Sequence, residues 1–176
     1  MSLTDTYDTP APIPEPSGPS AATISHPADL LLRVYYEDTD AAGVVYYANY
    51  LRFCERARTE WLRALGFSQQ AMFASEGLAF VVTRMEADYL RGAELDDWLR
   101  VASEVAASGR ASLVFRQRVW RGETLLFDSR VTIACVDMTS KRPRRLPAAL
   151  ADLLPSRLPR PSDNNPSDND TSTEPA

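Results

Sequence analysis

Residues 48–65 read ANYLRFCERARTEWLRAL, and the spacing of their side chains predicts one long helix. Apolar and small residues recur at steps of three and four, which places them on one face of a helix. Gly66 follows directly and is typical of the position where a helix ends. The predicted buried face holds Tyr50, Cys54, Ala57, Trp61, Ala64 and Leu65, and the opposite face holds Arg52, Arg56, Thr59, Glu60 and Arg63.

Strand-like runs lie on both sides of this helix. Before it, residues 30–36 read LLLRVYY, an apolar and aromatic run that predicts a strand, and a polar loop then leads to Gly43. After it, a short helix is expected at 68–75 and another at 146–154. Between these two short helices, strands are expected at 79–90, 99–107, 111–121 and 124–137.

The joints between the later strands predict how they pair. Residues 108–110 and 121–123 are short and contain glycine, which indicates hairpins and therefore antiparallel neighbours. The order of one strand, a long helix and four strands is α+β, because strands and helices do not alternate regularly. We therefore expect a five-stranded antiparallel sheet wrapped around one long central helix. In the last strand, one face is expected to hold Leu125, Phe127, Val131, Ile133 and Cys135.

The two ends of the chain differ from its middle in composition. Six of the 13 prolines lie in residues 1–28 and five in 155–176, and both segments are rich in small polar residues. Such segments bury too little apolar surface to offset the entropy of ordering, so we expect a disordered Pro-rich tail at 1–28 and a disordered acidic and polar tail at 155–176. One domain of ordinary size is left at 29–154.

Charge and targeting signals limit the possible partners and locations. The tails carry the whole net charge of −5, so the predicted domain is formally neutral, which argues against a nucleic-acid partner. Neither Cys54 nor Cys135 lies in a metal-binding spacing, and both are expected to be reduced. Because the chain has no long apolar run and no signal peptide, we expect a cytoplasmic location without membrane insertion.

Several common catalytic arrangements are missing from the predicted domain. The only histidine, His26, lies in the first tail, so no Ser-His-Asp or Cys-His pair is available within residues 29–154. No Walker A loop, GxGxxG or HExxH is present, and we expect neither a metal nor a cofactor. Carboxylates and backbone dipoles are then the expected tools for acid–base chemistry, with tyrosines and Lys141 as weaker options.

Asp40 is the carboxylate best placed for such chemistry. It lies in the loop that turns through Gly43 and enters the long helix. The first turn of a helix has unpaired N–H groups and a partial positive charge, which can hold a carbonyl oxygen as it becomes negative. Tyr47, at the junction of loop and helix, is the candidate N–H donor. Asp38 has the same chemistry nearby, and either aspartate could instead serve only as a turn or cap residue.

The residues around Asp40 carry a family resemblance. Residues 34–50 read VYYEDTDAAGVVYYANY, and residues 55–60 read ERARTE. This stretch closely resembles the Tol–Pal-associated acyl-CoA thioesterases, within the broader 4-hydroxybenzoyl-CoA thioesterase family. Weaker likeness extends through residues 88–91, 95–97 and 141–147, so the resemblance covers the predicted domain and neither tail. The pattern D-x-x-G-x-V-x-x-x-x-Y-x-x-x-x-E is matched by Asp40, Gly43, Val45, Tyr50 and Glu55.

The resemblance implies a hotdog fold and hydrolysis of an acyl-CoA, with a short-chain or aromatic acyl group, or of an acyl carrier protein thioester, without a metal. It further implies a homodimer or homotetramer with active sites between subunits. The catalytic aspartate of the family matches Asp40, which acts as base or as nucleophile. The backbone N–H of the residue at position 47 polarises the carbonyl. Many members carry histidine there, and because this chain has Tyr47, only a backbone role transfers.

Further residues are expected to support the reaction. The resemblance places Gly43, Val45 and Tyr50 in the substrate-binding part of the site. Glu55 is a rival carboxylate, but we expect it to pair with Arg52 and Arg58 and to act only through other residues, and we expect Glu60 to pair with Arg56. A basic run, KRPRR at 141–145, suits the phosphates of CoA. The expected phosphate contacts are Lys141, Arg142 and Arg144.

Two other functions compete with thioester hydrolysis. One is a non-catalytic acyl-thioester-binding or scaffold protein associated with the cell-envelope Tol–Pal system, in which the fold is kept and turnover is not. The other is a hotdog dehydratase, which usually pairs a carboxylate with a histidine. The predicted domain has no histidine, so the dehydratase ranks last.

Overall fold

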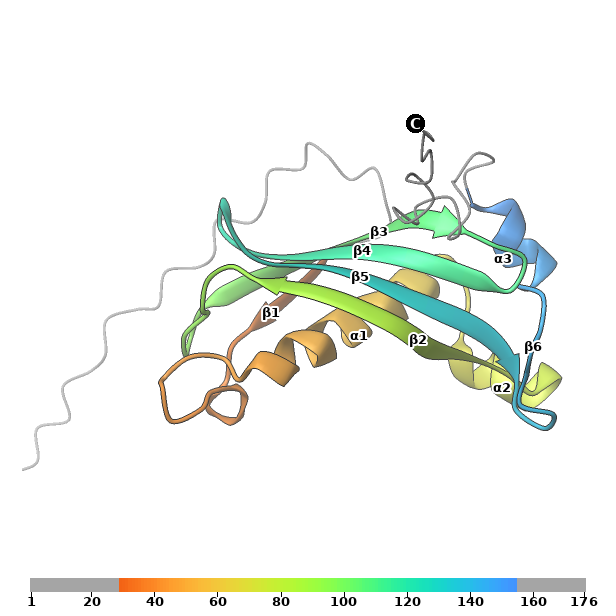
Figure 1. Cartoon of the computed structure of the whole chain (residues 1–176), viewed down its shortest axis with the longest axis horizontal. Helices are drawn as coiled ribbons and strands as arrows, with labels where there is room; N and C mark the ends of the chain where they lie inside the picture. Colours follow the sequence, from red (N-terminus) through yellow and green to blue (C-terminus); the bar gives the residue numbers. More distant parts are fainter. Residues whose placement is uncertain (1–28, 155–176) are drawn as a thin grey trace, which may run out of the picture.

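Residues 29–154 are the part of the chain that the computed structural model describes, and the two predicted tails lie outside them. The layout of helices and strands follows the predicted order (Figure 1). Before the sheet's long strands come β1 (Leu30–Arg33), the 3-10 turn η1 (Tyr36–Asp38), α1 (Tyr47–Ala64) and α2 (Gln69–Glu76). They are followed by β2 (Leu78–Tyr89), β3 (Trp98–Ser108), β4 (Ser112–Arg121), β5 (Thr124–Asp137), β6 (Arg142–Pro143) and α3 (Ala148–Asp152).

The strands form one antiparallel sheet in the order β1-β3-β4-β5-β2, and β6 adds a short pairing to β5. β2 therefore lies at one edge, although it precedes β3 in the sequence. Its register with β5 runs from Leu78 opposite Asp137 to Tyr89 opposite Phe127. The two hairpins predicted at the glycine-containing joints connect β3 with β4 and β4 with β5.

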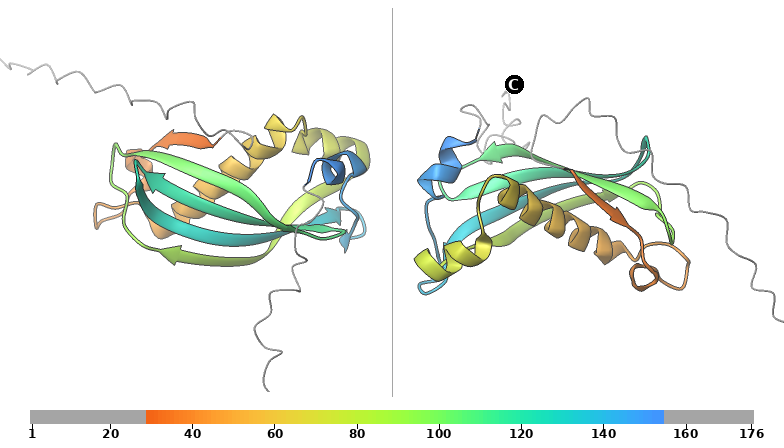
Figure 2. Two further views of the ribbon diagram at one scale, coloured as in Figure 1. Left: turned by 90° about the horizontal axis from the view of Figure 1, so that it is seen from above. Right: turned by 180° about the vertical axis from the view of Figure 1, so that it is seen from behind.

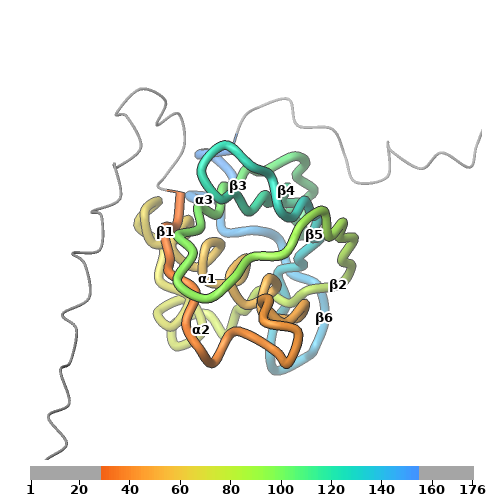
Figure 3. The backbone as a smooth tube through the Cα atoms, turned by 90° about the vertical axis from the view of Figure 1, so that its left-hand side faces the viewer, coloured from red at the N-terminus to blue at the C-terminus, as the bar shows by residue number. Residues whose placement is uncertain are grey.

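The long helix α1 lies against the concave face of the curled sheet, as the end-on view shows (Figures 2 and 3). Its buried side packs into two apolar clusters, one around Phe53 and Phe127 and the other around Trp61 and Phe115. Trp61 and Phe115 meet edge to face with ring centroids 5.1 Å apart. This arrangement confirms the predicted five-stranded sheet wrapped around one helix, which is the hotdog fold.

Three parts of the fold differ from the prediction. β1 ends at Arg33 rather than continuing to Tyr36, because the carboxylate of Asp38 accepts a hydrogen bond from the N–H of Tyr35 at 2.9 Å and closes a tight turn there. On α1, Ala64 is exposed rather than buried, whereas Trp61 and Leu62 in the same part of the helix lie in the apolar cluster. The additional strand β6 forms because the basic run folds back along the end of β5.

Candidate active site

The loop between η1 and α1 holds Asp40 through its own backbone. The N–H of Asp40 donates to the carbonyl of Val44 at 3.0 Å, and the N–H of Gly43 donates to the carbonyl of Asp40 at 2.9 Å. Gly43 has φ of +77°, a left-handed conformation that residues with a side chain rarely adopt. The glycine that closes this loop is therefore required by the turn itself.

The connection between β2 and β3 also holds this loop in place. The N–H of Val45 donates to the carbonyl of Ala93 at 2.7 Å, and Val44 forms an isolated antiparallel bridge with Glu94. Gly92 makes this approach possible, because a Cβ atom added there would lie 3.0 Å from Cγ1 of Val44. The Asp40 loop is thus docked on the connection between β2 and β3.

The two aspartates of the loop have different environments. Asp38 is buried, and its backbone carbonyl accepts hydrogen bonds from the N–H of Tyr46 at 2.8 Å and from Nδ2 of Asn49 at 2.9 Å. Asp38 therefore ties the loop to the helix. Asp40 is exposed, and only its Oδ1 has a partner within residues 29–154, the N–H of Ala42 at 2.8 Å. Its other oxygen, Oδ2, makes no hydrogen bond within residues 29–154. Of the two carboxylates, Asp40 is therefore the accessible one.

The helix start next to this loop has free backbone donors. Tyr46 is the N-cap of α1, and its side chain makes no capping hydrogen bond. Within residues 29–154, the N–H of Asn49 donates to the carbonyl of Tyr46 at 2.8 Å, whereas the N–H groups of Tyr47 and Ala48 have no acceptor and lie at the positive end of the helix dipole. A hydrogen bond with the phenol of Tyr47 raises the pKa of Tyr46, and the negative charge of Asp40 raises it further. Among the groups that act on the Tyr46 phenol, the carboxylate of Asp40 has the smallest effect.

Aromatic side chains surround this helix start. Tyr46 and Tyr47 lie with ring centroids 4.6 Å apart, and Tyr89, from the end of β2, meets Tyr47 edge to face at 6.3 Å. All three are exposed, whereas Tyr50, one turn further along α1, is buried and stacks on Phe127 at 5.2 Å. An exposed, largely aromatic surface therefore lies beside Asp40.

Two of the residues predicted to bind substrate lie in the core. The hydroxyl of Tyr50 accepts a hydrogen bond from the N–H of Ala93 at 2.9 Å, and burial raises the pKa of this phenol. Val45 is buried in the same apolar cluster. Both side chains therefore hold the loop and the helix together, and among the three predicted residues only Gly43 is exposed beside Asp40.

Glu55 lies away from Asp40, on the exposed side of α1. The ion pairs predicted for it with Arg52 and Arg58 do not form in the described part of the chain, because Glu55 accepts a hydrogen bond from Oγ1 of Thr59 at 2.9 Å. Glu60 likewise pairs with Arg63 rather than with Arg56. Glu55 lines a groove of about 540 Å³ between α1 and the edge strand β2. The other lining residues are Leu51, Arg52, Arg56, Arg58, Val82 and Met85.

A buried polar cluster lies beneath this groove, and no motif or spacing in the sequence predicts it. Arg58 is only 8% exposed and donates to Oε1 of Gln117 at 2.6 Å. Gln117 in turn donates to Oγ of Ser103 at 2.7 Å and to the carbonyl of Cys54 at 2.9 Å. Desolvation lowers the pKa of Arg58 and raises the pKa of the Cys54 thiol to about 11. The cluster links α1 to β3 and β4, and Cys54 remains a protonated thiol.

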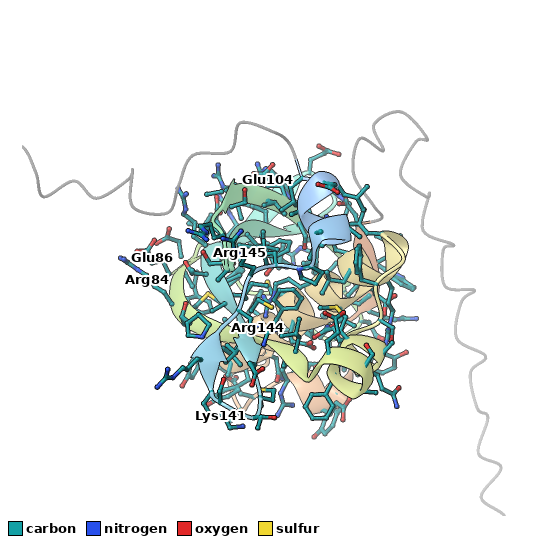
Figure 4. The ribbon with its side chains drawn as sticks, turned by 90° about the vertical axis from the view of Figure 1, so that its right-hand side faces the viewer. Arg84, Glu86, Glu104, Lys141, Arg144 and Arg145 are labelled. Carbon is teal, nitrogen blue, oxygen red and sulfur yellow. The ribbon has the colours of Figure 1, made fainter. Side chains whose placement is uncertain are left out.

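The basic run lies far from Asp40 within one chain. Lys141, Arg144 and Arg145 gather at the end of the molecule opposite the Asp40 loop (Figures 1 and 4). Asp137 organises this turn: its Oδ1 accepts hydrogen bonds from the N–H of Ser140 at 2.8 Å and from Thr139 at 3.1 Å, and its Oδ2 pairs with Arg144 at 3.1 Å. These hydrogen bonds lower the pKa of Asp137. One chain alone does not bring the predicted phosphate contacts to the candidate catalytic carboxylate.

Among residues 29–154, no cluster of three or more His, Cys, Asp or Glu side chains is arranged to hold a metal ion. In the same part of the chain, no helix has the length and apolar character needed to cross a membrane.

Comparison with known proteins finds consistent similarity. Residues 42–127 match the family model described as the thioesterase superfamily. The chain is 49% identical over 116 residues to the acyl-CoA thioesterase YbgC of Haemophilus influenzae, covering 66% of this chain and 85% of that protein. It is 51% identical over 120 residues to the acyl-CoA thioester hydrolase YbgC of Escherichia coli O6:H1, covering 68% and 89%. The crystal structure of a probable thioesterase from Bartonella henselae is 37% identical, with a TM-score of 0.66, and the match covers 68% of this chain and 98% of that one.

Proposed function

Because this chain belongs to the thioesterase superfamily, among the relatives of the YbgC acyl-CoA thioesterases, we propose that it hydrolyses a short-chain or aromatic acyl-CoA to the free acid and CoA. The observation that carries this proposal is the position of Asp40. An accessible carboxylate with one unpartnered oxygen lies in a loop that the backbone holds at the uncapped start of α1.

In the proposed reaction, the thioester carbonyl lies at the first turn of α1. The N–H of Tyr47 donates to the carbonyl oxygen and stabilises the negative charge that develops there. A single donor of this kind contributes about 3–4 kcal/mol to the lowering of a reaction barrier. A backbone donor does not depend on the side chain at position 47, which is why tyrosine serves as well as the histidine of many relatives.

Asp40 can act by two routes that remain open. As a base, it takes a proton from water, the resulting hydroxide attacks the thioester carbon, and the C–S bond breaks to release CoA thiolate, which takes up a proton. As a nucleophile, its free oxygen attacks the same carbon and expels CoA thiolate, leaving a mixed anhydride that water then hydrolyses. Both routes need an ionised Asp40 and the same carbonyl donor.

We further infer that two copies pair through the free edge of β2. This edge exposes Val81 and Val82 at 37% and 54%, which is unusual for an edge strand of an isolated chain. The groove beside it holds a buried cation, Arg58, that has no carboxylate within ion-pair distance among residues 29–154. The groove also holds Glu55. A copy related by a two-fold axis therefore brings its Glu55 toward Arg58 of the first copy, and its Arg58 toward Glu55 of the first copy.

Such pairing would also join the two separated ends of the site. β2 is 12 residues long, so its ends lie roughly 36 Å apart. A two-fold axis through the middle of β2 sets the strands antiparallel, and the Leu78 end of one copy then adjoins the Tyr89 end of the other. Since the basic turn lies beyond the Leu78 end, Lys141, Arg142 and Arg144 of one copy can reach the phosphates of CoA bound at the other copy's Asp40.

The proposal is tested by following free thiol during incubation with a panel of acyl-CoAs and acyl carrier protein thioesters. Asp40→Asn should lower kcat by roughly 100- to 10,000-fold, because an amide neither accepts the proton nor attacks the carbonyl. Glu37→Gln is the matched control, since Glu37 is an exposed carboxylate in the adjacent turn and should be dispensable. Full activity of the Asp40→Asn protein would contradict the proposed mechanism. Binding of acyl-CoA by the wild type without release of thiol would instead favour the non-catalytic alternative.

Turnover in ¹⁸O-labelled water can detect the nucleophilic route directly. In the nucleophilic route, water can attack the mixed anhydride at the Asp40 carbonyl carbon. Repeated turnover then places ¹⁸O in the Asp40 carboxylate, and mass spectrometry of the peptide that contains Asp40 detects the label. Label found only in the released acid favours the base route or attack at the acyl carbon.

A further inference from the structure

Tyr89 contacts the catalytic end of α1 from a distant part of the sequence. Its hydroxyl donates a hydrogen bond to the carbonyl of Tyr47 at 3.2 Å, joining the last residue of β2 to the first residue of the helix. The bond crosses 42 positions in the sequence, so it is a product of the fold and not of local turn geometry.

The ring of Tyr89 is held on three sides. It packs edge to face on Phe127 with centroids 5.0 Å apart, on Tyr50 at 5.8 Å and on Tyr47 at 6.3 Å. Desolvation raises the pKa of the Tyr89 phenol, so its proton stays available for donation at neutral pH. A held ring and a protonated hydroxyl together make this a fixed donor rather than a surface tyrosine that moves freely.

The bonded carbonyl belongs to the peptide unit between Tyr47 and Ala48. Each peptide unit polarises as a whole, so a hydrogen bond accepted by its oxygen strengthens its N–H as a donor. The N–H of that unit is the one of Ala48, which lies in the first turn directly after the N–H of Tyr47. The side chain of the N-cap residue Tyr46 makes no capping hydrogen bond, so contacts from other segments orient the first turn of α1, and the bond from Tyr89 is one of them.

We propose that Tyr89 is a positioning residue for the thioester carbonyl: its hydroxyl orients the first turn of α1 and strengthens the Ala48 N–H as a second donor to the oxyanion. This inference rests on the proposed function and extends it, because it adds a donor and a residue of β2 to the site. In this role, Tyr89 contacts neither the attacking water nor the thioester. It acts through the first turn of α1.

The test compares Tyr89→Phe with Tyr36→Phe in the full-length protein. Tyr89→Phe keeps the ring and removes the hydroxyl, while Tyr36 is a control tyrosine that is 83% exposed. We expect Tyr89→Phe to lower kcat roughly two- to tenfold with KM unchanged, because one hydrogen bond that matters mainly in the transition state is lost. Tyr36→Phe should leave both constants unchanged.

A spectroscopic measurement separates positioning from general loosening of the fold. The amide proton of Ala48 should shift upfield in the NMR spectrum of Tyr89→Phe and stay in place in Tyr36→Phe, since only the first change removes the bond to its peptide unit. An unmoved Ala48 amide, or an unchanged kcat, would overturn the inference even if Asp40→Asn is inactive. A rise in KM with kcat unchanged would also overturn it, because that pattern indicates lost substrate binding. A wild type that is inactive on every thioester would overturn the proposed function and this inference together.

Discussion

At the scale of single residues, the pair formed by Arg58 and Gln117 places a charged group in the interior of the protein. A buried guanidinium is tolerated when it is hydrogen-bonded, and here the amide oxygen of Gln117 supplies the bond at 2.6 Å. The same amide donates to Ser103 of β3 and to the backbone of Cys54 on α1, so one side chain of β4 satisfies groups from two other elements. Neither residue touches Asp40, and the role we assign to this pair is to hold α1 against the sheet.

Replacing Gln117 should therefore destabilise the protein strongly. Gln117→Leu leaves the buried cation of Arg58 without its acceptor, and we expect a loss of about 2–3 kcal/mol in the free energy of unfolding. Urea denaturation followed by circular dichroism measures this loss. Gln70→Leu, at an exposed position of α2, is the matched control and should change stability little. Equal stability of the two variants would mean that Arg58 finds another partner, such as the second copy.

At the scale of elements, the loop from Thr39 to Tyr46 positions the candidate catalytic carboxylate of Asp40. It is fixed by backbone hydrogen bonds to itself and to Ala93, and by the burial of Val45 in the apolar cluster around Phe53. The turn at Gly43 is the part of this loop that tolerates least change, because its φ of +77° excludes most residues.

Substitution of Gly43 tests how far the loop conformation controls activity. Gly43→Ala should lower the free energy of unfolding by about 1 kcal/mol, since a Cβ atom is strained at positive φ although no neighbouring atom obstructs it. Gly43→Asn should cost less, because asparagine enters the left-handed region more readily. Thermal unfolding gives the order of stability, and kcat should follow the same order. If alanine is tolerated better than asparagine, backbone strain is not what selects glycine here.

At the scale of the whole molecule, the two ends of one sheet carry different parts of the proposed chemistry. Asp40 and the start of α1 lie at one end, and the basic turn around Lys141 lies at the other (Figure 1). Pairing through β2 is the arrangement that would bring them together, and it would also cover the exposed valines and the groove along α1.

A charge placed on the β2 edge should therefore act on assembly and activity together. We expect Val82→Lys to shift the protein from dimer toward monomer, because a lysine on an edge strand opposes strand pairing. Phe73→Lys is the matched control, since Phe73 is exposed to the same 54% but lies on α2. Sedimentation equilibrium measures the dimer dissociation constant, and kcat should fall as the dimer is lost. A Val82→Lys protein that stays dimeric would place the interface elsewhere.

Much of the architecture could be predicted because local patterns encode it. Apolar residues that recur every three or four positions predicted a helix at 48–65, and both ends of α1 lie within one residue of that range. The glycine-containing joints predicted the two hairpins. The strand expected at 30–36 ends at Arg33 because Asp38 holds the following residues in a turn. Its carboxylate accepts a hydrogen bond from the N–H of Tyr35, and its backbone carbonyl accepts from Tyr46 and Asn49. These hydrogen bonds have no signature in local periodicity.

For the site, the sequence determined which residue types are available: an aspartate and glycine before a helix, no histidine within residues 29–154, and a basic run near the end of the domain. Only the tertiary structure showed that Asp38 is buried and Asp40 exposed, placed Tyr50 in the core, and brought Tyr89 to the carbonyl of Tyr47. The physical reason is that burial and hydrogen bonding are properties of contacts between segments distant in the sequence. Spacing along the chain specifies a helix face or a turn, but it does not specify which distant strand closes over it.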